Sequence, residues 1–158
     1  MNIQFEKAIP DDAKKLLEVQ IRAFHHDEVM YPDEPLAVGG PPDYDSLEVM
    51  LDDIEKQLCY KMVLDGVIIG GMTIFNRGEG HYHLHIIHID PPHHNKGIGS
   101  QAIRFIEATH SANKWTLDTP WYATRNQHFY EKLGYIKVGE TIETEGFVLF
   151  SYEKVMHR

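Results

Sequence analysis

The segment from His81 to His110 constrains the fold of this chain more than any other part of the sequence. It begins with HYHLHIIHID, in which polar and apolar residues nearly alternate, and this pattern predicts a β-strand. It ends with QAIRFIEATH, whose apolar spacing predicts a helix. Between the two, Gly97 and Gly99 are separated by one residue. The segment therefore predicts a strand, a glycine-containing turn and a helix, a combination that is typical of proteins with helices packed on a sheet.

The glycine turn has two interpretations. Backbone N–H groups at the start of a helix point outward, and the helix dipole adds positive potential, so the turn suits a phosphate or pyrophosphate. Glycine lets such a ligand approach the backbone closely, and Lys96 would add a charge. The alternative is an ordinary tight turn in which one glycine needs a positive φ. No Walker GKS or GKT sequence follows, and no third glycine completes a dinucleotide fingerprint.

The histidines of the predicted strand lie on one of its faces. Tyr82, Leu84 and Ile86 would form the opposite, apolar face, because side chains alternate along a strand. The alternation slips between Ile86 and Ile87, and a β-bulge there would restore one apolar face. It would also place His88 and Asp90 with His81, His83 and His85. A bulge leaves backbone groups unpaired, so we expect this strand to offer them to a ligand.

The remaining elements follow from periodicity and turn signals. Helices are predicted from Pro10 to about residue 24, and after a capping Ser46. A hairpin turns at Asp65-Gly66, and residues 31–44 form a loop rich in proline and glycine. Further strands are expected at residues 3–8, 114–119, 135–142 and 147–155, and a short helix from Asn126 to its stop at Gly134. The order β-α-α-β-β-β-α-β-α-β-β predicts an α/β fold (α+β mixed sheet): one domain over residues 1–158, with a central mixed sheet flanked by helices.

Composition narrows the class of protein. There is no apolar run of about 18 residues, so no membrane span or membrane partner is expected. The net charge of −9 argues against nucleic acid as a partner. The single cysteine, Cys59, excludes an internal disulfide and suits a reducing compartment, and the N-terminus lacks the features of a signal peptide. These observations predict a cytoplasmic protein.

Two segments, IDPPHHNKGIGSQAI and NQHFYEKLGY, together resemble the Gcn5-related N-acetyltransferase (GNAT) superfamily. That family has a strand ending in Val/Ile-x-Pro and then Gln/Arg-x-x-Gly-x-Gly/Ala, which Ile89 to Gly99 match. Its later motif, an asparagine followed by an aromatic-Tyr pair and Gly-Phe/Tyr, matches Asn126, Phe129, Tyr130, Gly134 and Tyr135. The order of elements also agrees with the family over essentially the whole chain. One residue departs from the pattern, because His94 stands at the Gln/Arg position.

The resemblance implies that acetyl-CoA is the cosubstrate and lies across the bulged strand. Main-chain groups of His88 and Ile89 would bind its pantetheine arm, and Asn126 would also bind that arm. Its pyrophosphate would lie on the turn, whose residues are His94, Asn95, Lys96, Gly97, Ile98, Gly99 and Ser100.

The resemblance also implies a reaction. A primary amine must lose a proton and attack the thioester, and the thiolate that leaves must gain a proton. Tyr130 matches the family's usual general acid, and an ordinary tyrosine pKa of about 10 keeps it protonated at neutral pH. His83 lies eleven residues before His94, where several family members place a carboxylate, so it is the predicted base. A water chain is the alternative, as are His81, His85, His88 and Asp90.

Two other functions compete with acetyl transfer. His83 and His85 could ligate zinc with Asp90 or His94, but neither cysteine pairs nor a histidine-rich helical motif support a metal site, and none is expected. A non-catalytic module that binds acyl-CoA is favoured by the loss of Gln/Arg and disfavoured by the retained Tyr130. We therefore predict direct transfer of acetyl from acetyl-CoA to a small-molecule amine in a ternary complex, with a homodimer left open. Acidic residues in and beside the loop would favour a cationic amine: Asp33, Glu34, Asp43 and Asp45.

Overall fold

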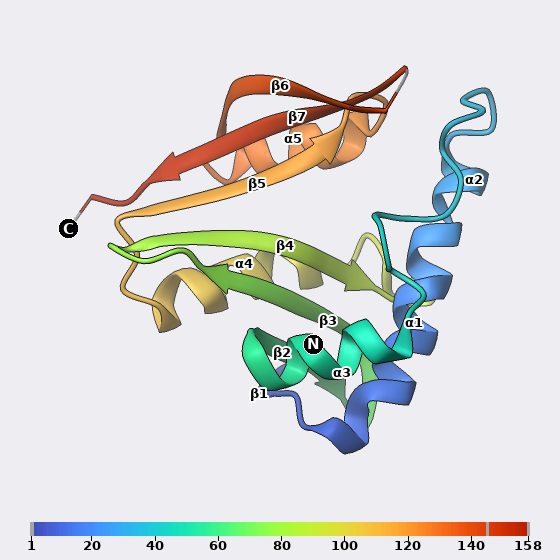
Figure 1. Cartoon of the computed structure of the whole chain (residues 1–158). Coiled ribbons are helices and arrows are strands. Elements are labelled where there is room, and N and C mark those ends of the chain that lie inside the picture. The colour runs from blue at the N-terminus through green and yellow to red at the C-terminus, as the bar shows by residue number, and fades with distance from the viewer. Residues whose placement is uncertain (1, 145, 158) are drawn as a thin grey trace.

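The computed structural model describes residues 2–144 and 146–157, and within them one seven-stranded sheet forms the centre of the molecule (Figure 1). Its strands are β1 (Gln4–Lys7), β2 (Leu58–Leu64), β3 (Val67–Asn76), β4 (His81–Ile89), β5 (Lys114–Pro120), β6 (Ile136–Thr144) and β7 (Phe147–Val155). They lie in the order β1-β2-β3-β4-β5-β7-β6. Strands β4 and β5 pair in parallel, and the other neighbours are antiparallel, which confirms the predicted mixed sheet.

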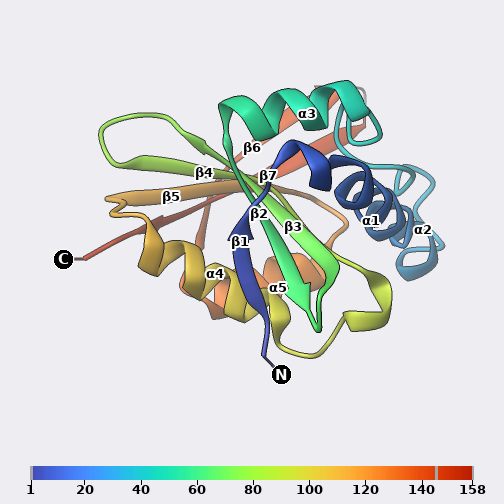
Figure 2. The ribbon, with the colours of Figure 1, turned by 90° about the horizontal axis from the view of Figure 1, so that it is seen from below.

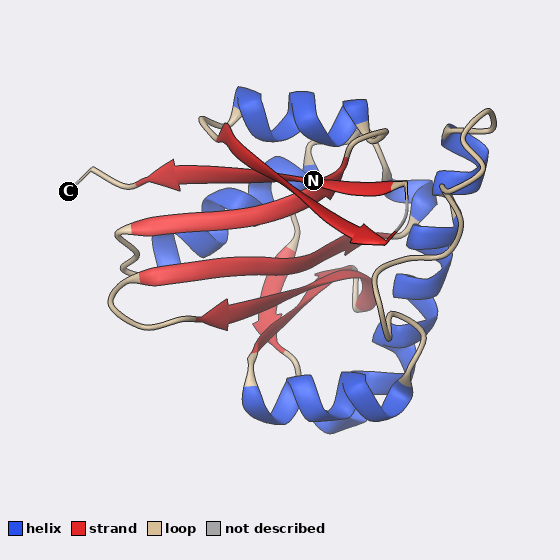
Figure 3. Cartoon of the chain, turned by 45° about the horizontal axis from the view of Figure 1, so that its top comes forward, coloured by secondary structure: helices blue, strands red, loops and turns tan. Residues whose placement is uncertain are grey.

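Helices cover both faces of the sheet. They are α1 (Ala13–His25), α2 (Asp27–Met30), α3 (Leu47–Lys56), α4 (Ile98–Thr109) and α5 (Thr124–Lys132), with 3-10 turns at Pro10–Asp12 and Pro91–His93. The view from below places α1 and α3 on one side of the sheet and α4 and α5 on the other (Figure 2). Figure 3 shows the same layers by type of structure. Helix α2, a single turn before the predicted loop, has no counterpart in the sequence prediction.

Local chemistry explains several element ends. The Ser46 hydroxyl accepts a hydrogen bond from the Val49 backbone N–H at 3.1 Å and so caps α3. Asp65 and Gly66 have φ of 50° and 76°, as a two-residue hairpin turn requires. Gly134 has φ of 96° just after α5, where a side chain would be strained. The predicted caps and turns are confirmed at these positions.

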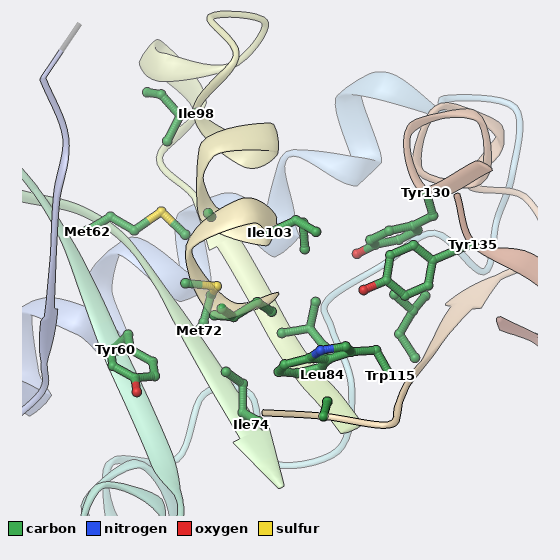
Figure 4. Packing of buried hydrophobic residues seen from close by; sticks show 14 of the residues in the cluster. Tyr60, Met62, Met72, Ile74, Leu84, Ile98, Ile103, Trp115, Tyr130 and Tyr135 are labelled. Carbon is green, nitrogen blue, oxygen red and sulfur yellow. The ribbon is translucent and has the colours of Figure 1, made fainter. Parts of the chain in front are cut away.

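The main core fills the space between the sheet and helices α4 and α5. Trp115, Tyr135 and Ile103 are buried there, and Figure 4 shows Tyr130 and Tyr135 side by side near Trp115. Glu107 of α4 accepts hydrogen bonds from the Tyr135 hydroxyl at 3.0 Å and from Lys154 Nζ at 2.8 Å. These contacts tie α4 to the C-terminal strands and so hold α5 and its Tyr130 in place.

The predicted bulge in β4 exists, but its position was wrong. Thr73 of β3 pairs with Ile86 and Ile74 pairs with Leu84, so the extra residue is His85 rather than one between Ile86 and Ile87. His85 is exposed, and an unpaired residue there keeps its polar groups near solvent.

The position of the bulge decides which residues lie on each face of β4. Ile87 and Ile89 pack against the main core with Leu84, as predicted. Ile86, however, is buried on the opposite face, beside residues of α3. That face is covered by α1 and α3, so it also accepts an apolar residue, and alternation alone could not locate the bulge. His83 and His88 share this second face, as predicted.

No helix among residues 2–144 and 146–157 is both long and apolar enough to cross a membrane.

Candidate active site

The two parallel strands β4 and β5 separate halfway along their length. They pair only from His81 to Leu84 and from Lys114 to Leu117, although β4 continues to Ile89 and β5 to Pro120. Figure 1 shows the two strands diverging beyond this point. Main-chain groups on this edge of β4 have no strand partner, so an extended ligand can bind along them.

A cavity of about 420 Å³ lies at this opening. Four segments line it: the end of α1 with α2, the end of β4, the turn before α4, and α5. Among the predicted site residues, those that line it are Tyr130, His88, Ile89, His94, Asn95, Gly97, Ile98, Gly99, Ser100 and Asn126. The structure therefore brings together two motifs that lie about thirty residues apart, while Lys96 and His83 do not line the cavity.

The glycine turn has the geometry of an anion cradle. Asn95 and Gly97 have φ of 62° and 78°, so the chain alternates in handedness just before α4 begins at Ile98. No side chain caps the helix, and its first N–H groups have no partner within the helix. A Cβ on Gly97 would meet nothing within 4 Å, so its positive φ is what requires glycine there. A Cβ on Gly99 would lie 3.0 Å from Cζ of Phe129, so this glycine lets α4 approach α5.

His94 fastens the turn to the end of β4. Its Nε2 lies 2.6 Å from the Ile89 carbonyl oxygen and donates a hydrogen bond to it. Burial lowers the pKa of His94, although this hydrogen bond opposes the shift, so the ring is neutral at neutral pH. The Ile89 carbonyl is therefore already bonded within the protein.

Arg125 is a site residue that the sequence prediction missed. It lines the cavity, and its Nη2 lies 2.5 Å from Oδ1 of Asn95. The side chain thus brings a positive charge beside the anion cradle. A cation in the first turn of a helix is unfavourable for the helix dipole, and this could have drawn attention to it.

Asp27, the first residue of α2, lines the same cavity and was also missed. It is the one carboxylate among the described lining residues. Burial raises the pKa of Asp27 to about 6. Nothing in the local sequence distinguishes it from the other acidic residues near the loop.

Tyr130 lines the cavity from α5 and is only 6% exposed. Burial raises the pKa of its phenol, so the hydroxyl stays protonated at neutral pH. Its ring packs edge-on against Phe129 and Tyr135, with centroid distances of 5.1 and 5.9 Å. A neutral phenol that lines the cavity has a proton that it can donate.

His83 lies on the face of the sheet away from α4 and is 6% exposed. Its Nδ1 is 2.7 Å from the Thr116 hydroxyl, and its Nε2 is 3.8 Å from a carboxylate oxygen of Asp118. Burial, with a smaller effect from Arg77, lowers the pKa of His83 to about 4. The ring is therefore neutral and weakly basic.

The other candidate zinc ligands make contacts elsewhere. Asp90 accepts two hydrogen bonds from the Arg22 guanidinium, at 3.0 and 2.9 Å, and His85 stacks on Phe75 at 4.4 Å. Across residues 2–144 and 146–157, no three His, Cys, Asp or Glu side chains come together where they could hold a metal ion.

His88 is buried without polar partners. It is 6% exposed, and within the described chain neither ring nitrogen has a hydrogen-bond partner. A Cβ on Gly71, the residue opposite on β3, would lie 2.9 Å from Cε1 of His88, so this glycine makes room for the ring. Burial lowers the pKa of His88 to about 3, so the ring is neutral.

Comparison with known proteins agrees with this geometry. The family model described as the acetyltransferase (GNAT) family matches residues 19–135. The chain is 28% identical to S-(2-succino)cysteine N-acetyltransferase of Bacillus subtilis (strain 168), over 98% of this chain and 96% of that one.

Solved structures share the fold. The PaiA N-acetyltransferase from Thermoplasma acidophilum, in complex with coenzyme A, has a TM-score of 0.74 at 19% identity and covers 99% of this chain and 100% of its own. An aminoglycoside 6′-N-acetyltransferase complexed with coenzyme A has a TM-score of 0.71 at 16% identity, with coverage of 100% and 99%. A GNAT acetyltransferase from Bacillus cereus ATCC 10987 has a TM-score of 0.76 at 16% identity and covers both chains fully.

The family model spans well over half of the chain, and the cradle, the separated strands and Tyr130 lie within one cavity. The protein belongs to the acetyltransferase (GNAT) family and is an N-acetyltransferase whose cosubstrate is acetyl-CoA.

Proposed function

We propose that the enzyme transfers acetyl directly from acetyl-CoA to the primary amine of a small molecule, with both substrates bound at once. The cavity carries this proposal, because it connects the anion cradle, the free edge of β4, Tyr130 and the α1–α2 side. In a continuous cavity the amine can reach the thioester without an acetylated enzyme intermediate.

The pyrophosphate of acetyl-CoA would lie on the turn between His94 and Ser100, beside Arg125. Unpartnered N–H groups at the start of α4 and the guanidinium of Arg125 both favour an anion there. The pantetheine arm would follow the main chain of His88 and Ile89, next to Asn126. Lys96 lies outside the cavity lining, so we expect it to contribute long-range charge only.

The reaction needs one proton removed from the amine and one given to sulfur. The neutral amine attacks the thioester carbonyl carbon, a tetrahedral intermediate forms, and the C–S bond breaks. Tyr130 would donate its phenolic proton to the leaving thiolate and recover one from the amide nitrogen, directly or through water. The raised pKa of Tyr130 supports this role, because the phenol keeps its proton until the thiolate forms.

The base role of His83 stays a prediction. Its place outside the cavity lining and its pKa of about 4 argue against it, since a weaker base drives proton removal less. A water chain remains the alternative.

Release of CoA from acetyl-CoA, measured with a panel of primary amines, tests the proposal. The panel includes S-(2-succino)cysteine, the acceptor in the name of the Bacillus subtilis relative. We expect turnover with at least one amine, and mass spectrometry should show a gain of one acetyl group on that amine. Tight binding of acetyl-CoA without turnover of any amine would instead support the non-catalytic acyl-CoA module.

Location and assembly belong to the same proposal. A cytoplasmic location is supported by the one cysteine, Cys59. It is buried, and burial raises its pKa to about 11, so its thiol is unreactive.

One continuous sheet supports a single domain. Strand β6 is exposed along its whole length at the sheet edge and would be available for a homodimer. Light scattering of the purified protein would give its mass in solution.

A further inference from the structure

We propose that the acceptor is an amine with a second positive charge, and that Asp27 binds this charge beside the rings of Tyr31 and Tyr122. The inference rests on the proposed acetyl transfer and names the class of acceptor.

Asp27 is placed for this role by α2. It lines the cavity together with Met30 from the same turn, and the residues around it on α1, Ala23 and Phe24, are apolar. Arg125 is the one lysine or arginine among the described residues that line the cavity, and it is hydrogen-bonded to Asn95. The described cavity lining therefore holds one guanidinium, beside the anion cradle, and one carboxylate, that of Asp27.

The charge of Asp27 is not compensated by the protein. Burial is the single cause of its raised pKa, so no described cation or hydrogen-bond donor offsets the loss of water around the carboxylate. A partly buried carboxylate without a partner is unfavourable, and a bound ammonium group would relieve it. The site is thus complementary to a cation rather than to an anion.

Aromatic rings lie beside this carboxylate. Tyr31 is four residues after Asp27, its N–H donates to the Asp27 carbonyl at 2.9 Å, and its ring meets that of Tyr122 edge-on at 5.2 Å. Burial raises the pKa of both phenols, and the Asp27 charge adds a smaller increase to each, as expected for a carboxylate that lies near them. Trp121 and Phe147 extend the cluster, with their centroids 5.1 Å apart. A carboxylate beside aromatic faces is a typical arrangement for binding an organic cation.

The charge held at Asp27 is distinct from the reacting amine. The reacting nitrogen must be neutral when it attacks, whereas a group that stays at Asp27 keeps its charge throughout. When acetyl-CoA is bound, its pyrophosphate would compensate Arg125, so Asp27 would be the uncompensated charge of the cavity lining that is left for the acceptor. A dicationic amine would therefore bind with one nitrogen at Asp27 and the other toward the thioester.

Three amines of matched length test this inference: 1,5-diaminopentane, pentylamine and 5-aminopentanoate. With the wild-type enzyme we expect kcat/KM for the diamine to exceed that for pentylamine by about 10-fold or more, as loss of a hydrogen bond to a charged group predicts. The anionic 5-aminopentanoate should be the poorest acceptor, because its carboxylate would face Asp27.

Variants test whether Asp27 and Tyr31 bind the second positive charge of the acceptor. Asp27→Asn should reduce the ratio of kcat/KM for the diamine to that for pentylamine by about 10- to 100-fold. Tyr31→Leu should reduce it by about 3- to 10-fold, the range for losing a cation–π contact. Glu28→Gln is the matched control, because Glu28 is the next residue of α2, is exposed and does not line the cavity. It should leave the ratio unchanged.

Equal turnover of pentylamine and the diamine, or better turnover of 5-aminopentanoate or S-(2-succino)cysteine, would overturn the inference and leave the acetyl transfer intact. An unchanged ratio in Asp27→Asn would also overturn it. No CoA release with any amine would overturn both the inference and the function on which it rests.

Discussion

Two parts of the cavity lining, the cradle before α4 and the segment α2, are suited to charged groups in different ways. At the cradle, the proposed anion site consists of backbone N–H groups, and two positive φ angles at Asn95 and Gly97 set the course of the chain there. At the α2 end, the charged group is a side chain, Asp27, and the rings beside it come from segments about ninety residues apart. A site made of backbone groups depends on a few adjacent residues, so it can be recognised in the sequence as a short motif. A site made of side chains from distant segments has no such motif in the sequence.

The largest expected effect is at Tyr130, which lines the cavity together with the cradle and Asp27. Tyr130→Phe removes the proton donor and keeps the ring, so we expect kcat to fall by about 10- to 10⁴-fold, the range for losing an acid or base. Affinity for acetyl-CoA, measured by calorimetry, should stay nearly the same. An unchanged kcat would remove Tyr130 from the acid role.

Substitution of Gly97 is the most direct way to change the geometry of the cradle. A valine there would have to adopt φ near 78°, a strain of about 1–3 kcal/mol, or the turn would change shape. We expect Gly97→Val to weaken acetyl-CoA binding by about 5- to 100-fold on this basis. Gly139→Val is a suitable control, because a Cβ at Gly139 meets nothing within 4 Å and no positive φ is found there. Equal affinity in the two variants would contradict the cradle.

The salt dependence of acetyl-CoA binding tests whether Arg125 acts through its charge. Arg125→Gln should raise Kd for acetyl-CoA by about 3- to 10-fold at low ionic strength, as loss of a charge-assisted hydrogen bond predicts. The difference from the wild type should shrink in about 1 M salt, where charges are screened. A difference that does not change with salt would mean that Arg125 acts through packing against Asn95 rather than through its charge.

His83 does not line the cavity, so we expect its substitution to have a smaller effect on activity. We expect His83→Gln to lower kcat/KM by less than about threefold, against the 10²-fold or more for an essential base. The pH profile distinguishes the cases: a His83 base would give an acidic limb near its pKa of about 4. A loss of about 100-fold with that limb removed would establish His83 as the base.

The smallest expected effect is on the stability of the folded protein, through Asp27 of α2. The pKa of Asp27 is about 6 in the folded protein and close to 3.9 in the unfolded chain, so the folded state holds its proton more tightly. Ionised Asp27 therefore lowers stability as pH rises from about 4 to 6, and the full cost persists above that range. Urea unfolding should show that Asp27→Asn is more stable than the wild type at pH 8 and gains nothing at pH 4. Glu28→Gln should give no such pH-dependent gain.

Sequence alone located the features that depend on neighbouring residues. The hairpin at Asp65-Gly66, the cap at Ser46 and the turn before α4 each need particular residue types within a few positions. The two family motifs contain most of the residues that line the cavity, because a strand, turn and helix hold them in a fixed local geometry. His94 also fits this pattern in hindsight, since its bond to Ile89 spans only five residues.

Other features were decided by tertiary contacts. The bulge lies at His85 because pairing with β3 and burial of Ile86 beneath α1 and α3 outweigh simple alternation along β4. Asp27 is distinguished from the other acidic residues only because α2 places it in the cavity lining, where burial raises its pKa and no described cation offsets the shift. Arg125 belongs to the candidate site only because α5 brings it to Asn95.

By itself, the sequence determined the order of elements in the mixed sheet, the glycine turn before α4 and the tyrosine that lines the same cavity, since backbone geometry follows local residue types. Only the tertiary structure decided where β4 and β5 separate, which histidines face the cavity, and which acid stands unpaired within it. Burial and charge compensation are sums over all neighbours in space, and most of those neighbours are far away in the chain.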